Sequence, residues 1–276
     1  MLLLSFLMVY PFWNQLILSF NDGLEAVRGG LYFLPRRFSL QAYEYVITNS
    51  NILRGAFISI LRVAVGTVTG LAFTGLLAYI VTIRRFSGRR FLRTLYLITI
   101  YLSSGLIPFY LLIVSLRMIN TFAVYWLPNL VNAYYMLIIS SYMQSIPESL
   151  SESARLDGAR ELTIFFRIMV PVSTPVLAAI AVFSAVGHWN SWFDVLIFNP
   201  GGKWDTITIY LRKILLAIEQ MEKLHNAQQL SEKYRRLVPQ TMRAATTMLV
   251  TLPIVFSYPF LQRYFIKGIT IGAVKE

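Results

Sequence analysis

A run of acidic and small residues between positions 145 and 175 has the spacing of a surface helix followed by a connector. The run reads SIPESLSESARLDGARELTIFFRIMVPVSTP. Pro147 suits a first helical turn, and Ser149 with Glu152 three residues later has the pattern of a capping box. Gly158 supplies the left-handed backbone at which many helices end. The pattern therefore predicts a short amphipathic helix, a turn, and a connector joined to the next apolar segment.

The chemistry that this helix suggests is docking onto another protein. A helix with small residues such as Ala154 and Ala159 can enter a groove on a partner, and a rigid connector then passes its motion onward. The alternative is a helix that rests on lipid. In that case Glu148, Glu152 and Asp157 would face a mostly anionic inner leaflet, which disfavours the alternative.

A second group of polar and aromatic residues lies near the end of a later apolar segment. Trp189, Asn190, Trp192 and Asp194 have residue types that can contact a carbohydrate, and they are candidate substrate-contacting residues. Sugar rings present apolar C–H faces edged by hydroxyl groups, which aromatic faces and planar polar side chains match. The alternative is an aromatic belt at the outer membrane interface.

A group of helix-breaking residues lies inside another apolar segment. Ser103, Ser104, Gly105 and Pro108 fall within the run 94–116, and Pro108 interrupts the helix expected there. These residues either line a cavity at a break in that helix or simply accompany a kink. Ser104 is retained as a candidate for the substrate path.

Three isolated features complete the set of candidate residues. Arg62 lies two turns into the apolar run 56–83, where a charge suggests function, but its long side chain can reach the outer surface and we expect it to do so. Gly66 and Gly70 form a small-xxx-small motif, which predicts a close helix contact within the chain or with a second subunit. His188 is expected to be structural.

Apolar segments must position all of these residues. The chain has 276 residues, of which 56% are apolar and 14% charged, whereas soluble domains carry about 25% charged residues. Six membrane crossings at about 20 residues each would use about 120 residues. The rest of the chain is needed for loops and a tail, so no room remains for a large soluble catalytic domain. Continuous apolar runs predict helices and not barrel strands. The six predicted spans are approximately 2–20, 56–83, 94–116, 122–143, 172–198 and 242–260.

Two segments have competing interpretations. The run 2–20 resembles a cleaved signal peptide in length, but it has no basic start and no small-residue cleavage site, so a retained helix is expected. The run 204–218 fits a short interfacial helix within an extracytoplasmic loop spanning about 199–240. A seventh span at 204–218 is disfavoured because Arg212 and Lys213 lie in its middle.

The distribution of positive charge predicts the orientation of the chain. The net charge is +12, and five arginines fall between Arg84 and Arg93. Because the charge lies between apolar segments, it indicates membrane orientation and not nucleic-acid binding. The arginine-rich loop is therefore placed in the cytoplasm, which puts both termini on that side.

Several kinds of chemistry are excluded by composition. The chain has no cysteine and only two histidines, so thiolate chemistry and a metal cluster are not expected. No phosphate-binding loop of the form G-x-x-x-x-G-K-[ST] occurs, and the Gly-Gly-Lys at 201–203 lacks both the upstream glycine and a following Ser or Thr. No cofactor is expected in this chain.

The run at 145–175 resembles the loop signature of bacterial binding-protein-dependent ABC transporter permeases. That pattern is Glu-Ala-Ala, three residues, Gly, nine residues, Ile, one residue and Leu-Pro. The matching positions here are Glu152, Ser153, Ala154, Gly158, Ile168, Val170 and Pro171, with Ser153 and Val170 as mild departures. The stretch 188–194 is similar to carbohydrate permeases of the maltose type. The stretch 251–275 is similar to the C-terminus of the sub-branch that handles oligosaccharides and polysaccharide fragments.

The resemblance implies an all-α polytopic membrane protein whose single transmembrane domain covers 1–276. It implies six transmembrane helices, a cytoplasmic coupling helix between the fourth and fifth, and a multi-pass location in the bacterial cytoplasmic membrane. The implied ATPase-coupling residues are Glu152, Ser153, Ala154, Asp157, Gly158 and Ala159. The tail 267–276 is similar to tails thought to reach the ATPase interface.

The resemblance also implies a set of partners. These are a cytosolic ABC ATPase dimer that binds ATP and Mg²⁺, a second related permease, an extracytoplasmic solute-binding protein, and a carbohydrate substrate. The chain itself would then not be an enzyme, and transport would proceed by alternating access.

Two other functions are weighed against this one. A membrane-embedded glycan-processing enzyme would need convergent carboxylates or a metal site, and the sequence offers neither. A secondary transporter would need acidic residues within the spans, and only Asp194 lies near one. Dependence of transport on a separate ATPase would distinguish the first function from both alternatives.

Overall fold

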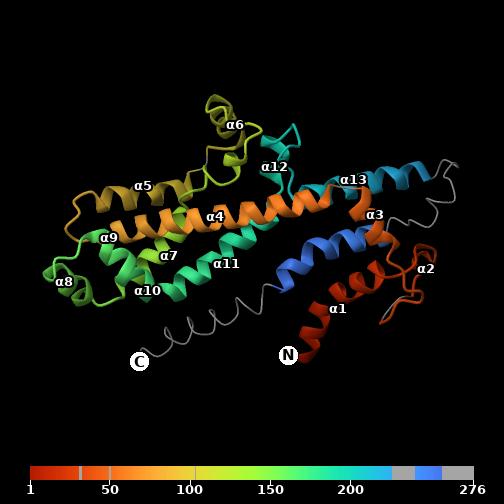
Figure 1. Ribbon diagram of the computed structural model, residues 1–276, viewed down its shortest axis with the longest axis horizontal. Helices are drawn as coiled ribbons and strands as arrows, with labels where there is room; N and C mark the ends of the chain where they lie inside the picture. Colours follow the sequence, from red (N-terminus) through yellow and green to blue (C-terminus); the bar gives the residue numbers. More distant parts are fainter. Residues whose placement is uncertain (31–32, 50, 103, 226–239, 257–276) are drawn as a thin grey trace. The chain divides into compact units, whose positions relative to one another are not determined.

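Helices make up the secondary structure of the chain (Figure 1). The computed structural model describes residues 1–276 except 31–32, 50, 103, 226–239 and 257–276. Within the described residues there is no strand, only one isolated antiparallel bridge between Asn21 and Phe38. The expected helical class is therefore confirmed. Its physical reason is that apolar segments satisfy their backbone hydrogen bonds internally when they form helices.

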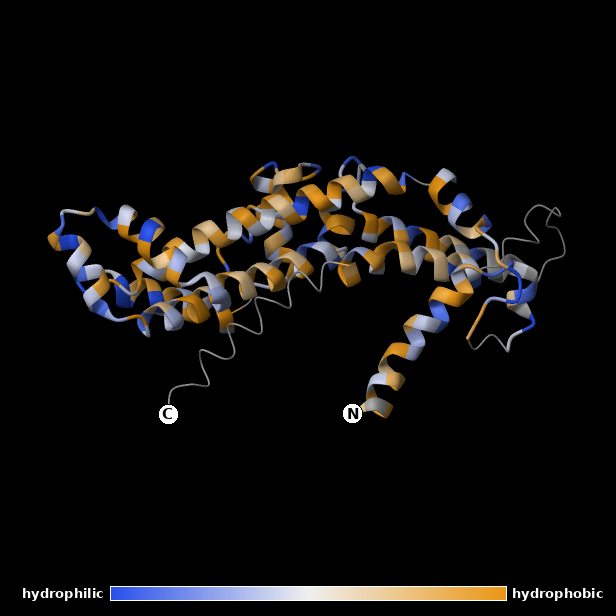
Figure 2. Cartoon of the chain, turned by 60° about the horizontal axis from the view of Figure 1, so that its bottom comes forward, coloured by the Kyte–Doolittle hydropathy of each residue, from blue (hydrophilic) through white to orange (hydrophobic). Residues whose placement is uncertain are grey.

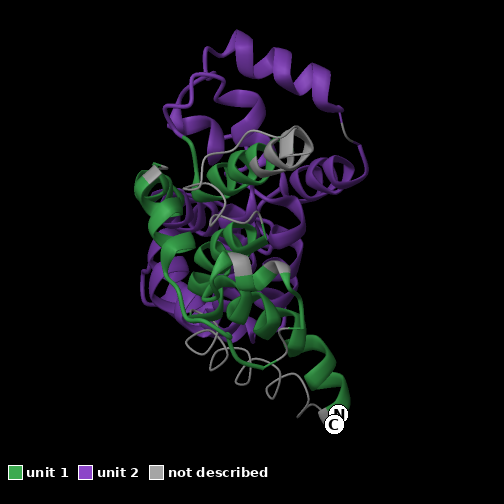
Figure 3. Cartoon of the chain, turned by 90° about the vertical axis from the view of Figure 1, so that its right-hand side faces the viewer, with its two compact units in different colours: residues 1–59, 205–257 green, residues 60–204, 258–276 purple. Residues whose placement is uncertain are grey.

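The chain divides into two compact units, coloured separately in Figure 3. The first comprises residues 1–59 and 205–257, and the second comprises residues 60–204 and 258–276. Each unit is described by itself below. The single transmembrane domain expected from the sequence stays a prediction.

The first unit contains the helices at the two ends of the described chain. These are α1 (Leu2–Ser19), α2 (Gly23–Val27), α3 (Gln41–Asn49), the beginning of α4 (Ile52–Ile80), α13 (Ile207–His225) and a helix over 240–256. The predicted helical segments at 2–20, 204–218 and 242–260 correspond to α1, α13 and the last of these helices. The end of the third segment lies outside the described residues, as does the tail 267–276.

Small residues and hydroxyl groups join the helices of the first unit. The Ser19 hydroxyl lies 2.8 Å from the Tyr43 hydroxyl, and the backbone N–H of Ile207 donates to Ser59 Oγ at 3.0 Å. Gly55 allows Tyr210 to pack directly on α4, because a β-carbon at position 55 would lie 2.5 Å from the ring. These contacts attach the start of α13 to the start of α4.

The second unit contains the remaining, mostly shorter helices. They are the rest of α4, α5 (Arg89–Tyr101), α6 (Leu106–Ser115), the 3₁₀ turn η1 (Phe122–Tyr125), α7 (Ala133–Gln144), α8 (Glu148–Leu156), α9 (Glu161–Ile164), the π-helical turn η2 (Phe165–Met169), α10 (Val170–Val172), α11 (Thr174–Asn190) and α12 (Phe193–Phe198). α7 packs against both α5 and α11. The predicted segment 56–83 corresponds to α4.

The core of the second unit lies where α4 ends beside α7, η2 and α11. Ala78, Met136, Ile139 and Ile164 have no exposed surface there, and Met169 packs beside them. Burial of each large apolar side chain contributes about 1.5–3 kcal/mol. This cluster fixes the region that leads into α8.

The predicted helix over 94–116 is broken, but not at Pro108. α5 ends at Tyr101 and α6 begins at Leu106, with Gly105 at φ +76° between them. Pro108 is the third residue of α6, where its missing N–H has no partner to lose. Ser103 lies outside the described residues.

The predicted continuous helices over 122–143 and 172–198 are also wrong in detail. The first consists of η1 and α7, and Pro128 lies in the non-helical stretch between them. The second consists of α11 and α12, separated at Ser191 and Trp192. The break is stabilised by Asp194, whose carboxylate accepts from the Ser191 hydroxyl at 2.7 Å and from the Val195 N–H at 2.9 Å.

By length and apolar character, α4 is the one helix among the described residues that could cross a membrane alone. The pair Glu161–Val172 and Thr174–Asn190, bent by 82°, is a second candidate if it is counted as one span. Shorter apolar helices occur at Leu3–Ser19 and Leu106–Ser115. Figure 2 shows hydrophobic residues along α4 and α1, and hydrophilic residues gathered around α8. The six-span arrangement stays a prediction.

Candidate functional site

The helix predicted within 145–175 exists as α8, and its end has a defined geometry. Gly158 follows the helix with φ +82°. Its N–H donates to the Arg155 carbonyl at 3.0 Å, and the N–H of Ala159 donates to the Ala154 carbonyl at 2.9 Å. This pair of bonds is a Schellman motif, which requires a left-handed residue at position 158 and explains the glycine.

The start of α8 differs from the prediction. The helix begins at Glu148 with Pro147 as the preceding cap residue, and no side chain caps it. The capping box expected from Ser149 and Glu152 is therefore not formed. Because the helix starts two residues earlier than that motif requires, Ser149 lies inside the first turn and its hydroxyl is not at the capping position.

Two ion pairs brace α8 against neighbouring segments. Arg155 Nε donates to the Glu161 carboxylate at 2.8 Å, and the Tyr79 hydroxyl at the end of α4 donates to the same carboxylate at 2.5 Å. The hydrogen bond from Arg155 lowers the pKa of Glu161 below its ordinary value. Arg84 also pairs with Glu148 at 3.1 Å. α8 is thereby tied to α9 at one end and to the arginine-rich loop at the other.

The connector after α8 is a short composite helix. α9, η2 and α10 run without interruption to Ser173, where the chain bends by 82° into α11. Phe165 and Met169 are buried while Phe166 is exposed, so the π-helical turn presents one face to the core. Ser173 itself has no exposed surface. The connector thus attaches α8 to α11 through a packed bend.

The six predicted coupling residues divide by burial. Glu152, Ser153, Asp157 and Gly158 are exposed on α8 and its turn. Ala154 and Ala159 are half-buried and pack against the core of this unit. The two alanines thus already have a packing role within the chain, and the exposed side chains are the ones available to a partner.

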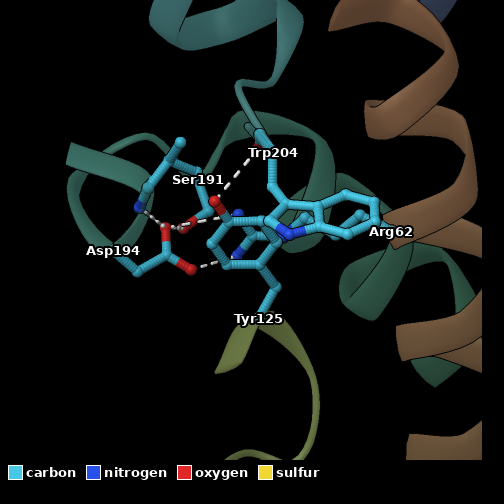
Figure 4. A network of polar contacts seen from close by, with 6 residues as sticks. Arg62, Tyr125, Ser191, Asp194 and Trp204 are labelled. Carbon is cyan, nitrogen blue, oxygen red and sulfur yellow. Dashed lines mark hydrogen bonds and ion pairs between the residues drawn. The ribbon is translucent and has the colours of Figure 1, made fainter. Parts of the chain in front are cut away.

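A buried ion pair lies at the break between α11 and α12 (Figure 4). Both terminal nitrogens of the Arg62 guanidinium, on α4, donate hydrogen bonds to the Asp194 carboxylate. The distance from Nη1 to Oδ1 is 3.3 Å, and Nη2 donates to Oδ2. The side chain of Arg62 is only 3% exposed, and that of Asp194 is 22% exposed. The expectation that Arg62 reaches the outer surface is therefore wrong, because the break brings Asp194 opposite it and pairing offsets part of the cost of burial.

Aromatic residues extend this ion pair into a network. The Arg62 guanidinium lies 4.7 Å from the centre of the Tyr125 ring, and the Tyr125 hydroxyl donates to the Trp204 carbonyl at 3.1 Å. The Trp204 indole N–H in turn donates to the Asn120 carbonyl at 3.1 Å. Tyr125 has no exposed surface, so this arrangement fixes the loops at both ends of the network to α4.

A cavity of about 320 Å³ opens beside the ion pair. Arg62, Asp194, Asn129, Asn132, Ser184 and Ser191 contribute polar side chains, and Tyr135, Phe183 and Phe193 contribute aromatic ones. Polar groups among aromatic faces can bind a sugar through hydrogen bonds and ring stacking. The cavity lies within the size range of small-molecule sites, which is about 300–1,000 Å³.

The predicted substrate-path residues are only partly gathered at this cavity. Asp194 lines it, whereas Trp189, Asn190 and Trp192 are not among its lining residues. Ser104 lies elsewhere, at the exposed break before α6, and its hydroxyl donates to the Gly105 carbonyl at 3.4 Å. Their role in transport stays a prediction.

The glycine motif and His188 meet at the same cavity. A β-carbon at Gly66 would lie 2.4 Å from Nε2 of His188, so the motif makes a close contact within this chain. Sequence reasoning overlooked Asn129, Asn132 and Tyr125. The opposite charges of Arg62 and Asp194 were the signal that could have found the network, since lone charges in apolar segments require partners. Among the described residues, no group of three or more His, Cys, Asp or Glu could hold a metal.

Residues 70–271 match the family described as binding-protein-dependent transport system inner membrane component. The chain belongs to this family, and the resemblance expected from the sequence is confirmed. The family description places its members in the inner membrane.

Curated relatives cover nearly all of the chain. The polygalacturonan/rhamnogalacturonan transport system permease protein YtcP of Bacillus subtilis (strain 168) is 33% identical over 278 residues, covering 100% of this chain and 95% of that protein. Protein LplC of the same organism is 35% identical over 270 residues, covering 97% and 89%. The arabinooligosaccharides transport system permease protein AraQ of Bacillus subtilis (strain 168) is 27% identical over 279 residues, covering 99% and 93%. YtcP and AraQ are named as transport permeases and not as enzymes.

A solved structure has the same fold. It is described as the crystal structure of a bacterial ABC transporter involved in the import of the acidic polysaccharide alginate. The matched chain superposes with a TM-score of 0.86 at 24% identity, covering 95% of this chain and 92% of that one.

Proposed function

We propose that this chain is the transmembrane permease subunit of an ATP-driven ABC importer for an oligosaccharide. It spans the cytoplasmic membrane six times with both termini in the cytoplasm, and α8 is the coupling helix between the fourth and fifth spans. An extracytoplasmic solute-binding protein delivers the sugar, a second related permease completes the pathway, and a cytosolic ATPase dimer binds ATP and Mg²⁺. The family and the names of the sugar-transporting relatives support this function.

The observation that carries the proposal is the construction of α8. Its carboxylates Glu152 and Asp157 are exposed, its end is set by the Schellman motif at Gly158, and Arg155 ties it to Glu161. A helix held in this way moves as a rigid piece with the connector and α11. Closure of the ATPase pair can then be passed to the membrane segments as alternating access.

The cavity beside Arg62 and Asp194 is our proposed sugar path. The polar and aromatic lining described above suits a carbohydrate, and we place Trp189, Asn190, Trp192 and Ser104 along the remainder of the path or at its outer gate. The sugar then makes different contacts with the cavity in the inward-facing and outward-facing states of the transporter. Such a difference in contacts is the condition for coupled transport.

The test replaces Gly158 by aspartate and compares it with Gly29→Asp. Both glycines are exposed and left-handed, with φ +82° and +67°, and neither has an atom within 4 Å of an added β-carbon. The two substitutions therefore impose the same kind of backbone strain, about 1–2 kcal/mol, but only one lies on the docking surface. We expect Gly158→Asp to abolish both copurification of the ATPase and sugar uptake, and Gly29→Asp to leave both unchanged.

The measurements are membrane abundance, copurification of the ATPase with tagged permease, and uptake of labelled oligogalacturonate or arabino-oligosaccharide. Wild-type uptake by Gly158→Asp would contradict docking through α8. Uptake that persists without the ATPase and collapses with an uncoupler would favour a secondary transporter. Conversion of the oligosaccharide by the purified chain would favour a glycan-processing enzyme.

A further inference from the structure

A second cavity lies in the same unit, between the arginine-rich loop and α8. Its volume is about 500 Å³. The walls come from the end of α4 and the turn after it, the first two turns of α5, the end of α7, and α8. The cavity is separate from the one beside Arg62, and no lining residue is shared between the two.

The lining of this cavity is strongly positive. Six arginines line it, namely Arg84, Arg85, Arg89, Arg90, Arg93 and Arg155, against two acidic residues, Glu148 and Glu152. Two of these arginines are already paired, Arg84 with Glu148 and Arg155 with Glu161. Within the described part of the chain, the guanidinium groups of Arg89, Arg90 and Arg93 form no ion pair.

The unpaired arginines lie in the first two turns of α5. The first turn contains no acidic residue, and no side chain caps the helix. The start of a helix carries a partial positive charge, which adds to the charge of the arginines and favours an anion. Like charges this close repel one another, so a bound anion would remove an unfavourable interaction as well as adding favourable ones.

We propose that this cavity binds a phosphate-bearing anion through Arg89, Arg90 and Arg93. The guanidinium group presents N–H donors in a planar fork that matches the spacing of phosphate oxygens, and such charge-assisted hydrogen bonds are stronger than neutral ones. The cavity exceeds the size of a single ion and accommodates a phosphorylated headgroup or a small phosphorylated molecule. α8 forms one wall through Glu152 and Arg155, so the bound anion lies directly against the proposed coupling helix.

The phosphate has two possible sources, an anionic phospholipid headgroup or a soluble phosphate compound. To separate them, the intact transporter is purified in detergent and exposed either to phosphatidylglycerol, with phosphatidylcholine as the neutral comparison, or to inorganic pyrophosphate. Native mass spectrometry counts the retained lipid, and calorimetry measures pyrophosphate binding. Preferential retention of phosphatidylglycerol identifies the lipid source, and binding of pyrophosphate alone identifies the soluble one.

The decisive variant is Arg89→Gln combined with Arg93→Gln. Because this variant removes two charge-assisted hydrogen-bonding groups, we expect its affinity for the bound probe to fall at least roughly tenfold. The matched control is Arg37→Gln, which removes an exposed arginine from outside the cavity. Arg90→Gln is a second, single substitution for use if the double variant fails to assemble, and we expect it to weaken binding in the same direction.

Either source supports the proposal if the probe is lost in the cavity variants and retained in Arg37→Gln. The proposal is overturned if neither probe binds the wild-type transporter. It is also overturned if the cavity variants bind as tightly as the control. None of these outcomes depends on sugar transport, so they are separate from the test of α8 docking.

Discussion

Replacing Asp194 by asparagine removes the negative charge that faces Arg62 while keeping the shape of the side chain. The Arg62 side chain is only 3% exposed, so the variant leaves a buried guanidinium without its counter-charge. Breaking a buried ion pair on one side costs about 3–5 kcal/mol. Because Asp194 is 22% exposed and asparagine keeps one acceptor oxygen, we expect a smaller loss, about 2–3 kcal/mol.

The assay is thermal unfolding of the purified transporter in detergent, followed by the loss of its monodisperse elution peak. A destabilisation of this size corresponds to a drop in midpoint of about 5–10 °C, by the scaling for chains of this length. The matched control is Glu25→Gln, which breaks the exposed pair of Arg28 and Glu25, whose atoms lie 2.8 Å apart and whose arginine is 71% exposed. That control should change stability by less than about 1 kcal/mol.

A double variant tests the reasoning itself. Arg62→Met with Asp194→Asn removes both charges together and keeps an acceptor oxygen for the Ser191 hydroxyl and the Val195 N–H. We expect it to recover most of the stability lost in Asp194→Asn, because no uncompensated charge remains. The reasoning is refuted if Asp194→Asn is as stable as the wild type. It is also refuted if the loss of stability in the double variant equals the sum of the losses in its two single variants.

Two further predictions follow from contacts near the two cavities. Gly66→Ala should destabilise the chain by about 1–3 kcal/mol, because the new β-carbon would lie 2.4 Å from His188 Nε2. The control is Gly187→Ala, whose new β-carbon meets no atom within 4 Å. This control should be neutral or stabilising in the same thermal assay. Glu161→Gln should lower stability at neutral pH by at most about 1 kcal/mol, since the ion pair is partly exposed. The Arg155 hydrogen bond lowers the pKa of Glu161 below 4.5, so its contribution is present above that pH and lost as the pH falls through the lowered pKa. The midpoints of wild type and Glu161→Gln should therefore converge as the pH falls through the lowered pKa of Glu161. A difference that stays constant while the Glu161 carboxyl titrates would contradict the assignment.

The positions of most helices followed from local patterns in the chain. Apolar runs of sufficient length predicted α1, α4 and the start of the helix over 240–256 to within four residues, because backbone hydrogen bonding within a helix depends on neighbouring residues alone. The short interfacial helix predicted over 204–218 exists as α13, but it continues to His225. Gly158 was predicted to end α8 for the same reason, since a left-handed residue is required wherever a Schellman motif closes a helix.

The breaks within helices were harder to place. Proline was expected to interrupt 94–116, but Pro108 is harmless in the first turn of α6 and the chain turns at Gly105. The break after Asn190 is not marked by proline or glycine. It depends on Asp194, which accepts from Ser191 and pairs with an arginine 132 residues earlier in the chain. A local pattern contains no information about so distant a partner.

The amino-acid sequence by itself determined the helical class, the family signature around Glu152 and Gly158, and the excess of positive charge at 84–93. Tertiary structure determined which charges are paired and which are not. The charge of Arg62 is paired because folding brings Asp194 to it. Arg89, Arg90 and Arg93, in contrast, gather around a cavity lined by six arginines and only two acidic residues. The physical reason is that the energy of a charge depends on its burial and on the charges around it, and both are set by packing between segments far apart in the chain.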